Sequence, residues 1–444
     1  MNPRARILVL VTAVAACFLG VLLTAPAAQA HAELVRSTPA DRARLSAIPA
    51  QVTLTFSEGI AEQDCAVRAG GRNLPIHQPA GQPNVLVADL SRVQASGGKL
   101  VLDWRSVSSD DGHVATGSIS FQIPDAPAAD ASAAAGAAPI PGPDPAVRYA
   151  TIGAQFAGFL CAALFIGVLA FFALIWPQGA GVPRMRRALS AAWILGLAAT
   201  LAQTGLQAAY GALLPLGGVF NGSALENLFA TRLGAVLIAR AGLWLLAGVV
   251  LAALLQQQDR AARSPGWRVG LIAVAFGLLR TTSMPGHDDT AHPLVGAVAD
   301  TAHLAGVSLW IGGLLTLLFG VLPRRLPQEM AGAVARYSKL ALVSMLVIIA
   351  AGTVLAWQLV GSVSALLHTS YGHTLLLKLA FVATVLLLAQ HSKAWVRHRL
   401  DVAVLLDGDR ATVRPFVYSV AAEAGLALAV LAAASVLVTS NPGR

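Results

Sequence analysis

Eight long apolar stretches in the C-terminal two thirds of the chain constrain its fold more than any other feature. A hydrocarbon core of roughly 30 Å is crossed by about 20 helical residues, and most of the stretches reach that length. Only 12% of the chain is charged, against about 25% in a typical soluble domain. We therefore predict an all-α polytopic membrane domain of about eight helices over residues 148–440. The stretches lie near 151–176, 186–210, 232–255, 268–284, 296–322, 339–360, 373–395 and 416–439.

Basic residues between the stretches predict the orientation of this domain. Cytoplasmic loops of membrane proteins carry an excess of Lys and Arg. Here the loops after the first, third, fifth and seventh stretches are basic, and one opposite loop carries Asp288 and Asp289. Both the preceding domain and the C-terminus are therefore expected outside the cytoplasm. The same excess of basic residues in cytoplasmic loops explains the net charge of +9. Because this charge needs no nucleic acid to explain it, we expect a lipid bilayer and no nucleic acid as partner. The basic residues are Arg184, Arg186, Arg187, Arg260, Arg263, Arg268, Arg324, Arg325, Arg336, Lys339, Lys393, Arg397, Arg399, Arg410 and Arg414.

The first 30 residues have the form of a signal peptide. A basic start is followed by the apolar run from Ile7 to Leu23, and then by Ala28-Gln29-Ala30, a small-residue cleavage site. Cleavage there makes His31 the first residue of the mature chain. Two alternatives are a signal anchor, against which Pro26 argues, and lipoprotein processing at Cys17.

Residues 31–124 show the alternation of apolar and polar side chains that half-buried strands require. Turn-forming glycine pairs and an Asp-Gly pair separate these segments. We predict a small all-β domain, an antiparallel sandwich or Greek-key barrel. The residues 125–147 that follow are almost entirely Ala, Pro, Gly and Asp, which predicts a linker. The expected strands are Gln51–Phe56, Val85–Asp89, Lys99–Arg105 and Gly117–Ile123.

A metal site in the β-domain is suggested by histidine rather than by cysteine. The three cysteines are scattered over the signal segment, the β-domain and the first stretch, which excludes a Cys-rich site. An N-terminal His31 offers an amine and an imidazole to one metal. Asp111 and His113 are two apart and point the same way in an extended segment. Three nitrogens and one oxygen suit Cu(II); the alternative is a solvated histidine in an Asp-Gly turn.

Three segments of the β-domain resemble the CopC family of periplasmic copper-binding β-barrels. They are His31-Ala-Glu-Leu34, Leu54-Thr-Phe-Ser-Glu58, and Trp104-Arg-Ser-Val-Ser-Ser-Asp-Asp-Gly-His113 with Gly117. The resemblance implies a Cu(II) site of the histidine-brace type formed by the amine and side chain of His31, by Asp111 and by His113. Residues 31–124 contain no methionine, the ligand that Cu(I) prefers, so we expect Cu(II) alone. His77 is expected in a surface loop.

A second group of histidines lies around the start of the fifth stretch. His287 and His292 precede it, and Asp300 and His303, spaced i and i+3, share one helix face within it. His373 is expected on the same side of the membrane. Ionisable groups at membrane depth usually mark an ion path, so these five residues form a candidate path for copper. Solvated loop or interfacial positions are the alternatives, most clearly for His292 and His373.

This region resembles the CopD family of copper-resistance membrane proteins. The resemblance rests on Gly286-His287, on Asp300-Thr-Ala-His303-Leu-Ala-Gly-Val-Ser-Leu-Trp-Ile-Gly-Gly-Leu314, and on Tyr371-Gly-His-Thr-Leu-Leu-Leu-Lys-Leu379. It implies movement of copper across the bacterial cytoplasmic membrane, inward.

Together these features predict a non-enzymatic CopC–CopD fusion in which the β-domain captures Cu(II) and passes it to the helices. A membrane copper sensor or storage module is one alternative. A cupric reductase or an oxidative enzyme that uses the histidine brace is the other. The sequence identifies no copper chaperone or reductase as partner.

Overall fold

The computed structural model describes residues 34–93, 98–109, 112, 114–123, 143–283, 293–324 and 326–360, and the single residues 364, 367, 373, 375, 376 and 379. The chain divides into two compact units. The β-domain unit joins the β-domain to Ala202–Leu237, and the helical unit contains Ile152–Leu201 and the chain from Ile238 onward.

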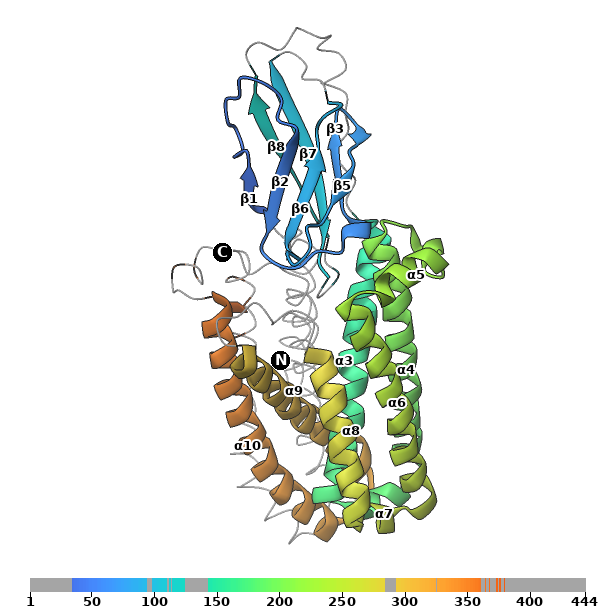
Figure 1. The fold of residues 1–444 in the computed structure, drawn as a ribbon. Coiled ribbons are helices and arrows are strands. Elements are labelled where there is room, and N and C mark those ends of the chain that lie inside the picture. The colour runs from blue at the N-terminus through green and yellow to red at the C-terminus, as the bar shows by residue number, and fades with distance from the viewer. Residues whose placement is uncertain are drawn as a thin grey trace, which may run out of the picture. The chain divides into compact units, whose positions relative to one another are not determined.

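Two four-stranded antiparallel sheets form the β-domain, as predicted (Figure 1). One has the order β1 (Leu34–Thr38), β2 (Gln51–Phe56), β6 (Val85–Asp89) and β5 (Ile76–His77). The other has the order β4 (Arg72–Asn73), β3 (Ala66–Ala69), β7 (Lys99–Val107) and β8 (Val114–Gln122).

The core of the β-domain lies between the inner faces of these sheets. Alternate residues of β2, namely Val52, Leu54 and Phe56, are buried there, as the period-2 pattern requires. Phe56 meets Trp104 of β7 edge to face, with ring centroids 5.5 Å apart. Each such buried side chain stabilises the domain by about 1.5–3 kcal/mol. The sandwich is therefore held by the apolar positions that the alternation marked.

Two of the four predicted strands, β2 and β6, match the structure in both bounds. The other two differ, because β7 continues to Val107 and β8 begins at Val114 rather than Gly117. Gly117 is a strand residue opposite Trp104, where a Cβ would lie 2.5 Å from Trp104 Cζ2. Its missing side chain makes room for the indole and does not mark a turn.

Strands β1, β3, β4 and β5 were not predicted. β4 and β5 have two residues each, too few for alternation to be recognised. His77 is an exposed residue of β5 and pairs with Val87, so the expected loop position was wrong.

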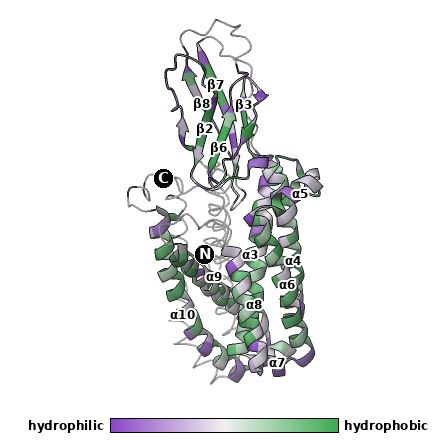
Figure 2. Cartoon of the chain, viewed as in Figure 1, coloured by the Kyte–Doolittle hydropathy of each residue, from purple (hydrophilic) through white to green (hydrophobic). Residues whose placement is uncertain are grey.

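Six long helices correspond to the first six apolar stretches. Within the described residues, five segments are suited to cross a membrane: α3, α4, α6, the segment Leu294–Arg324, which includes α9 from its second residue on, and α10. The shorter α8 is not among them, and the seventh and eighth stretches lie almost wholly outside the described residues. Hydrophobic residues dominate the long helices, whereas hydrophilic ones gather around the short α7 (Figure 2). The helices are α3 (Pro145–Leu174), α4 (Pro183–Gly211), α5 (Gly222–Phe229), α6 (Arg232–Gln257), α7 (Asp259–Arg263), α8 (Pro265–Ser283), α9 (Pro293–Thr316) and α10 (Pro327–Val360).

Helix α3 begins at Pro145, inside the segment expected to be a linker up to residue 147. Asp144 caps it, because the Ala146 amide donates to Asp144 Oδ1 at 2.7 Å, and proline is favoured at the first helical position. The Asp144-Pro145 pair thus begins a helix, although the Ala- and Pro-rich composition of residues 125–147 is typical of a linker.

Glycines let α9 pack closely between α3 and α10. A Cβ at Gly306 would lie 2.9 Å from Ile348 Cγ1, and one at Gly312 would lie 2.5 Å from the Cα of Gly167. Small residues allow helix backbones to approach in this way in membranes. The Tyr337 hydroxyl donates to the Trp310 carbonyl at 2.6 Å and adds a bond between α10 and α9. This packing fixes the position of the polar residues on α9.

Candidate metal sites

The start of β1 and the β7–β8 turn lie at one end of the sandwich. Leu34, the first residue of β1, pairs with Phe56, the last residue of β2. Beyond β2, the Gly59 carbonyl accepts a hydrogen bond from the Ser109 amide at 3.0 Å, and Ile60 pairs with Ser108. The two serines directly follow β7. The register of the sheets therefore gathers three segments that are far apart in sequence.

The three predicted copper ligands, His31, Asp111 and His113, lie outside the described residues. Their described neighbours are informative. His31 is three residues before Leu34, a span of at most about 10 Å. Asp111 and His113 belong to the connection between Val107 and Val114, which pair with each other. The neighbours of all three predicted ligands are thus at the same end of the β-domain.

Gly112 determines the course of that connection. Its φ is +71°, in the left-handed region that glycine adopts at no steric cost. Its amide donates to the Ser108 carbonyl at 3.1 Å. Gly112 therefore has the backbone conformation of a turn residue, at a place where the sequence indicated a turn.

Glu58 is a charged residue of this end to which the sequence analysis gave no role. It is 8% exposed and precedes Gly59, whose carbonyl binds the amide of Ser109. Burying a carboxylate costs free energy unless a cation or hydrogen bonds compensate. The available signal was an acidic residue two positions after the end of an alternating strand. Glu58 is therefore a further carboxyl group at the end where a cation is expected.

Cys65 has the environment of a structural thiol. Burial raises the pKa of the Cys65 thiol to about 12, and its Sγ donates to the Ala61 carbonyl at 3.2 Å. A metal-binding or reactive cysteine is stabilised instead as its thiolate. Cys65 is therefore a packed thiol of the β-domain core.

On α9, Asp300 and His303 are one helical turn apart. Asp300 is 9% exposed. His303 Nδ1 donates to the Ile348 carbonyl of α10 at 3.0 Å, and because a carbonyl only accepts, Nδ1 carries the hydrogen. In the neutral imidazole the lone pair then lies on Nε2. Metal-binding histidines are commonly oriented by such a bond from the second nitrogen to a backbone carbonyl.

Of the other members of the predicted path, only His373 belongs to the described residues. His373 Nε2 donates to the Leu367 carbonyl at 2.8 Å and is exposed, while His287 and His292 lie outside the described residues. Within the part of the chain that the structure describes, no group of three or more His, Cys, Asp or Glu side chains is placed to hold a metal ion. The five-residue path therefore stays a prediction.

Comparison with protein families identifies two regions of the chain. Residues 34–124 match the model described as CopC domain. Residues 331–437 match the model described as Copper resistance protein D. Both resemblances seen in the sequence are thereby confirmed.

Two individual proteins are similar to part of this chain. Copper resistance protein C of Pseudomonas syringae pv. tomato is 34% identical over 113 residues, which are 23% of this chain and 87% of that protein. The crystal structure of CopC from Methylosinus trichosporium OB3b matches 21% of this chain and 93% of its own, at 26% identity and a TM-score of 0.19.

One relative extends over both regions. Copper transport protein CutJ of Bacillus subtilis (strain 168) is 31% identical over 383 residues, which are 81% of this chain and 67% of that protein. The relatives are copper transport and copper resistance proteins, in agreement with the expectation of a non-enzymatic chain. The chain therefore belongs to the copper-resistance membrane family in which a CopC domain is joined to a CopD domain.

Proposed function

We propose that this protein imports copper across the bacterial cytoplasmic membrane. The β-domain captures Cu(II) outside and passes it to the helical unit, which crosses the bilayer eight times with both termini outside. The observation that carries the proposal is the convergence of Leu34, Gly59 and Ser109 at one end of the sandwich. It places the neighbours of three predicted ligands together in a chain whose helices suit a membrane.

Capture of Cu(II) uses the amine and imidazole of His31 with Asp111 and His113. This tetragonal set of three nitrogens and one oxygen matches the preference of Cu(II). It requires cleavage after Ala30, so that the β-domain begins at residue 31. The buried carboxylate of Glu58 balances the charge of the bound cation. The absence of methionine from residues 31–124 keeps this domain selective for the oxidised ion.

Acceptance of copper by the helical unit uses His303. Its ring is held in one orientation by the bond from Nδ1 to the Ile348 carbonyl, as in many metal-binding histidines. Asp300, one turn earlier, supplies a compensating negative charge. His287, His292 and His373 are proposed companions on the outer side. Arg and Lys in alternate loops support this orientation.

Copper accumulation in cells that lack the protein tests this function. Cells complemented with the wild-type chain are expected to accumulate more copper at limiting external copper than cells with an empty vector. Zinc is the control metal, and its accumulation is expected to be equal in the two. Equal copper in both would contradict import. A transporter is expected to lose copper flux in His303→Gln while Cu(II) binding is retained. A sensor or storage protein is expected to show no change in copper flux or in Cu(II) binding.

A further inference from the structure

The β-domain unit includes helical residues that follow in sequence much later. The C-terminal part of α4 from Ala202, the whole of α5, and the start of α6 up to Leu237 belong to the same compact unit as the sandwich. We call these residues, 202–237, the platform. Asn227 of α5 donates from Nδ2 to Asp64 Oδ1 at 3.4 Å. The platform therefore contacts the β-domain through defined side chains.

The contact involves the end of the sandwich that carries the predicted copper ligands. Gly112, between Asp111 and His113 in sequence, lies so close to α4 that a Cβ on it would be 2.5 Å from Gln207 Nε2. The same Cβ would be 2.9 Å from Leu233 Cδ2 of α6. On the platform side, a Cβ at Gly211 would lie 3.8 Å from Val107 Cγ1. Residues without side chains thus permit this approach on both surfaces.

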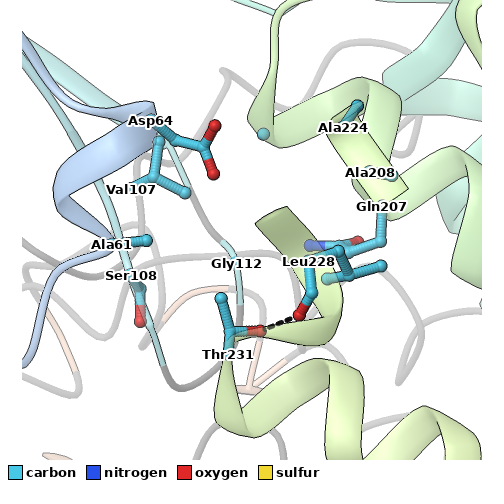
Figure 3. Close-up of a pocket in the computed structure, with 11 residues that line it drawn as sticks. Ala61, Asp64, Val107, Ser108, Gly112, Gln207, Ala208, Ala224, Leu228 and Thr231 are labelled. Atoms are coloured by element: carbon cyan, nitrogen blue, oxygen red, sulfur yellow. Dashed lines mark hydrogen bonds between the residues drawn. The ribbon is translucent and has the colours of Figure 1, made fainter. Parts of the chain in front are cut away.

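A small cavity of about 20 Å³ separates the two surfaces, enough for about one water molecule. Figure 3 shows Asp64, Ser108 and Gly112 on one side of it and Gln207 and Thr231 on the other. Polar groups line both sides together with small or apolar ones such as Ala61 and Ala224, and the hydrogen bond between Asn227 and Asp64 is long. Such a hydrogen bond adds little net stability, because bonds to water replace it when the contact opens. The contact has the character of one that forms and separates.

We propose that the platform is a reversible docking surface for the β-domain of the same chain, and that it receives the turn carrying the copper site. Gln207 and Gly211 set how closely the turn approaches. This inference rests on the proposed function only in treating the turn as copper-bearing. Docking brings the loaded turn to one defined place on the helices, instead of leaving it free on a tether.

Cross-linking in the full-length protein tests docking without any copper measurement. Asp64→Cys with Asn227→Cys, in a background of Cys65→Ala and Cys161→Ala, is treated in membranes with a short bifunctional thiol reagent. A protease site placed in the segment 125–142 then separates the two parts unless they are linked. The linked product is expected for this pair. It is not expected for Lys99→Cys with Asn227→Cys, because Lys99 is eight residues from Val107 along β7, about 27 Å. Equal linking of both pairs, or none of either, would overturn the proposal.

A wedge variant with a matched control tests the consequence for transport. Gly211→Trp places an indole where Val107 and Asp64 lie within 4.0 Å, whereas Gly217 in the same connection has nothing within 4 Å. Gly211→Trp is expected to lose the cross-link and copper uptake but to keep the Cu(II) signal of the β-domain. Gly217→Trp is expected to keep the cross-link, copper uptake and the Cu(II) signal. Uptake unchanged in both overturns a docking role. If the Asp64→Cys and Asn227→Cys pair cross-links but the wild-type chain imports no copper, the proposed function alone is overturned.

Discussion

His303 on α9 donates its Nδ1 hydrogen to the carbonyl oxygen of Ile348 on α10, at 3.0 Å. Gly352, one turn further along α10, lies against the same ring, since a Cβ there would be 3.3 Å from Cε1. The imidazole is therefore oriented by a neighbouring helix and not only by its own rotamer. A ring held in this way resembles a metal ligand more than a solvated surface histidine.

Replacing this ring is expected to stop copper uptake. His303→Gln removes the imidazole while keeping a polar side chain, and we expect the loss of uptake with the Cu(II) signal of the β-domain unchanged. His373→Gln is the control, because that exposed histidine bonds to Leu367 away from the α9–α10 contact. Uptake is measured as cellular copper. Equal loss in the two variants would assign no special role to His303.

Gly117→Ala is expected to destabilise the β-domain. The added Cβ would lie 2.5 Å from Trp104 Cζ2, and the indole is 7% exposed and packed on Phe56. Overpacking of a filled core costs about 1–3 kcal/mol. The rate at which the buried Cys65 reacts with a thiol reagent, in a Cys161→Ala background, reports opening of the domain. Ser118→Ala, an exposed neighbour on β8, is expected to leave that rate unchanged.

Asp64 and Asp89 are expected to respond to pH with opposite signs. Burial raises the pKa of Asp64, although Asn227 and Arg105 oppose it. A raised folded-state pKa gives stability below the unfolded value that is lost as pH rises through the folded value. Asp64→Asn should therefore be more stable than wild type at neutral pH, with the advantage vanishing near about pH 4. Asn retains an oxygen for the Asn227 donor.

The control for this prediction is Asp89. The hydrogen bond from the Ser91 amide, at 2.8 Å, lowers the pKa of Asp89. Its contribution is present above the unfolded pKa and is lost as pH falls through the folded one. Asp89→Asn should therefore weaken the domain at neutral pH and not under acid. The urea midpoint of unfolding, followed by limited proteolysis at neutral pH and at about pH 4, measures the stability of both variants. If the stability of the two variants relative to wild type changed with pH in the same direction, the opposite pKa shifts of Asp64 and Asp89 would be contradicted.

Gly312→Leu is expected to disrupt the helical unit. A Cβ at this position would lie 2.5 Å from the backbone of Gly167, which cannot move aside as a flexible side chain would. Helices α3 and α9 must separate, and their close packing is lost. Gly158→Leu on α3 is the matched control because nothing lies within 4 Å of its Cβ position. Thermal unfolding in detergent should show a lower midpoint for Gly312→Leu alone.

Periodicity was sufficient for the elements that are long or regularly buried. It predicted β2 and β6 in full, because burial of one face repeats along each, whereas the length of the apolar stretches predicted the six long helices. It failed for β4 and β5, which are too short to repeat. It also failed at Gly117 and at Asp144-Pro145, where a residue type usual in turns or linkers serves packing or capping. Composition alone does not distinguish these uses.

The candidate sites show the same limit. Spacing correctly put Asp300 and His303 one turn apart, but the bond to Ile348 depends on how α9 and α10 pack. Likewise, only the pairing of Leu34 with Phe56 and of Ile60 with Ser108 shows that the start of β1 lies near the β7–β8 turn. Local patterns identify the ligand-bearing segments, and tertiary contacts decide whether they meet.

The copper site of the β-domain should depend on the position of one peptide bond. If cleavage follows Ala30, the α-amine of His31 joins its imidazole as a ligand. The intact mass of the mature protein should then equal that of a chain that begins at His31. Inserting one alanine between Ala30 and His31 moves the amine away while every side chain stays. We expect the Cu(II) electron paramagnetic resonance signal to change and the affinity to fall, as it should for Asp111→Ala or His113→Ala. His77→Ala, on the exposed β5, is the control and should leave the signal unaltered. An unchanged signal after the insertion would exclude the amine as a ligand and with it the histidine-brace geometry.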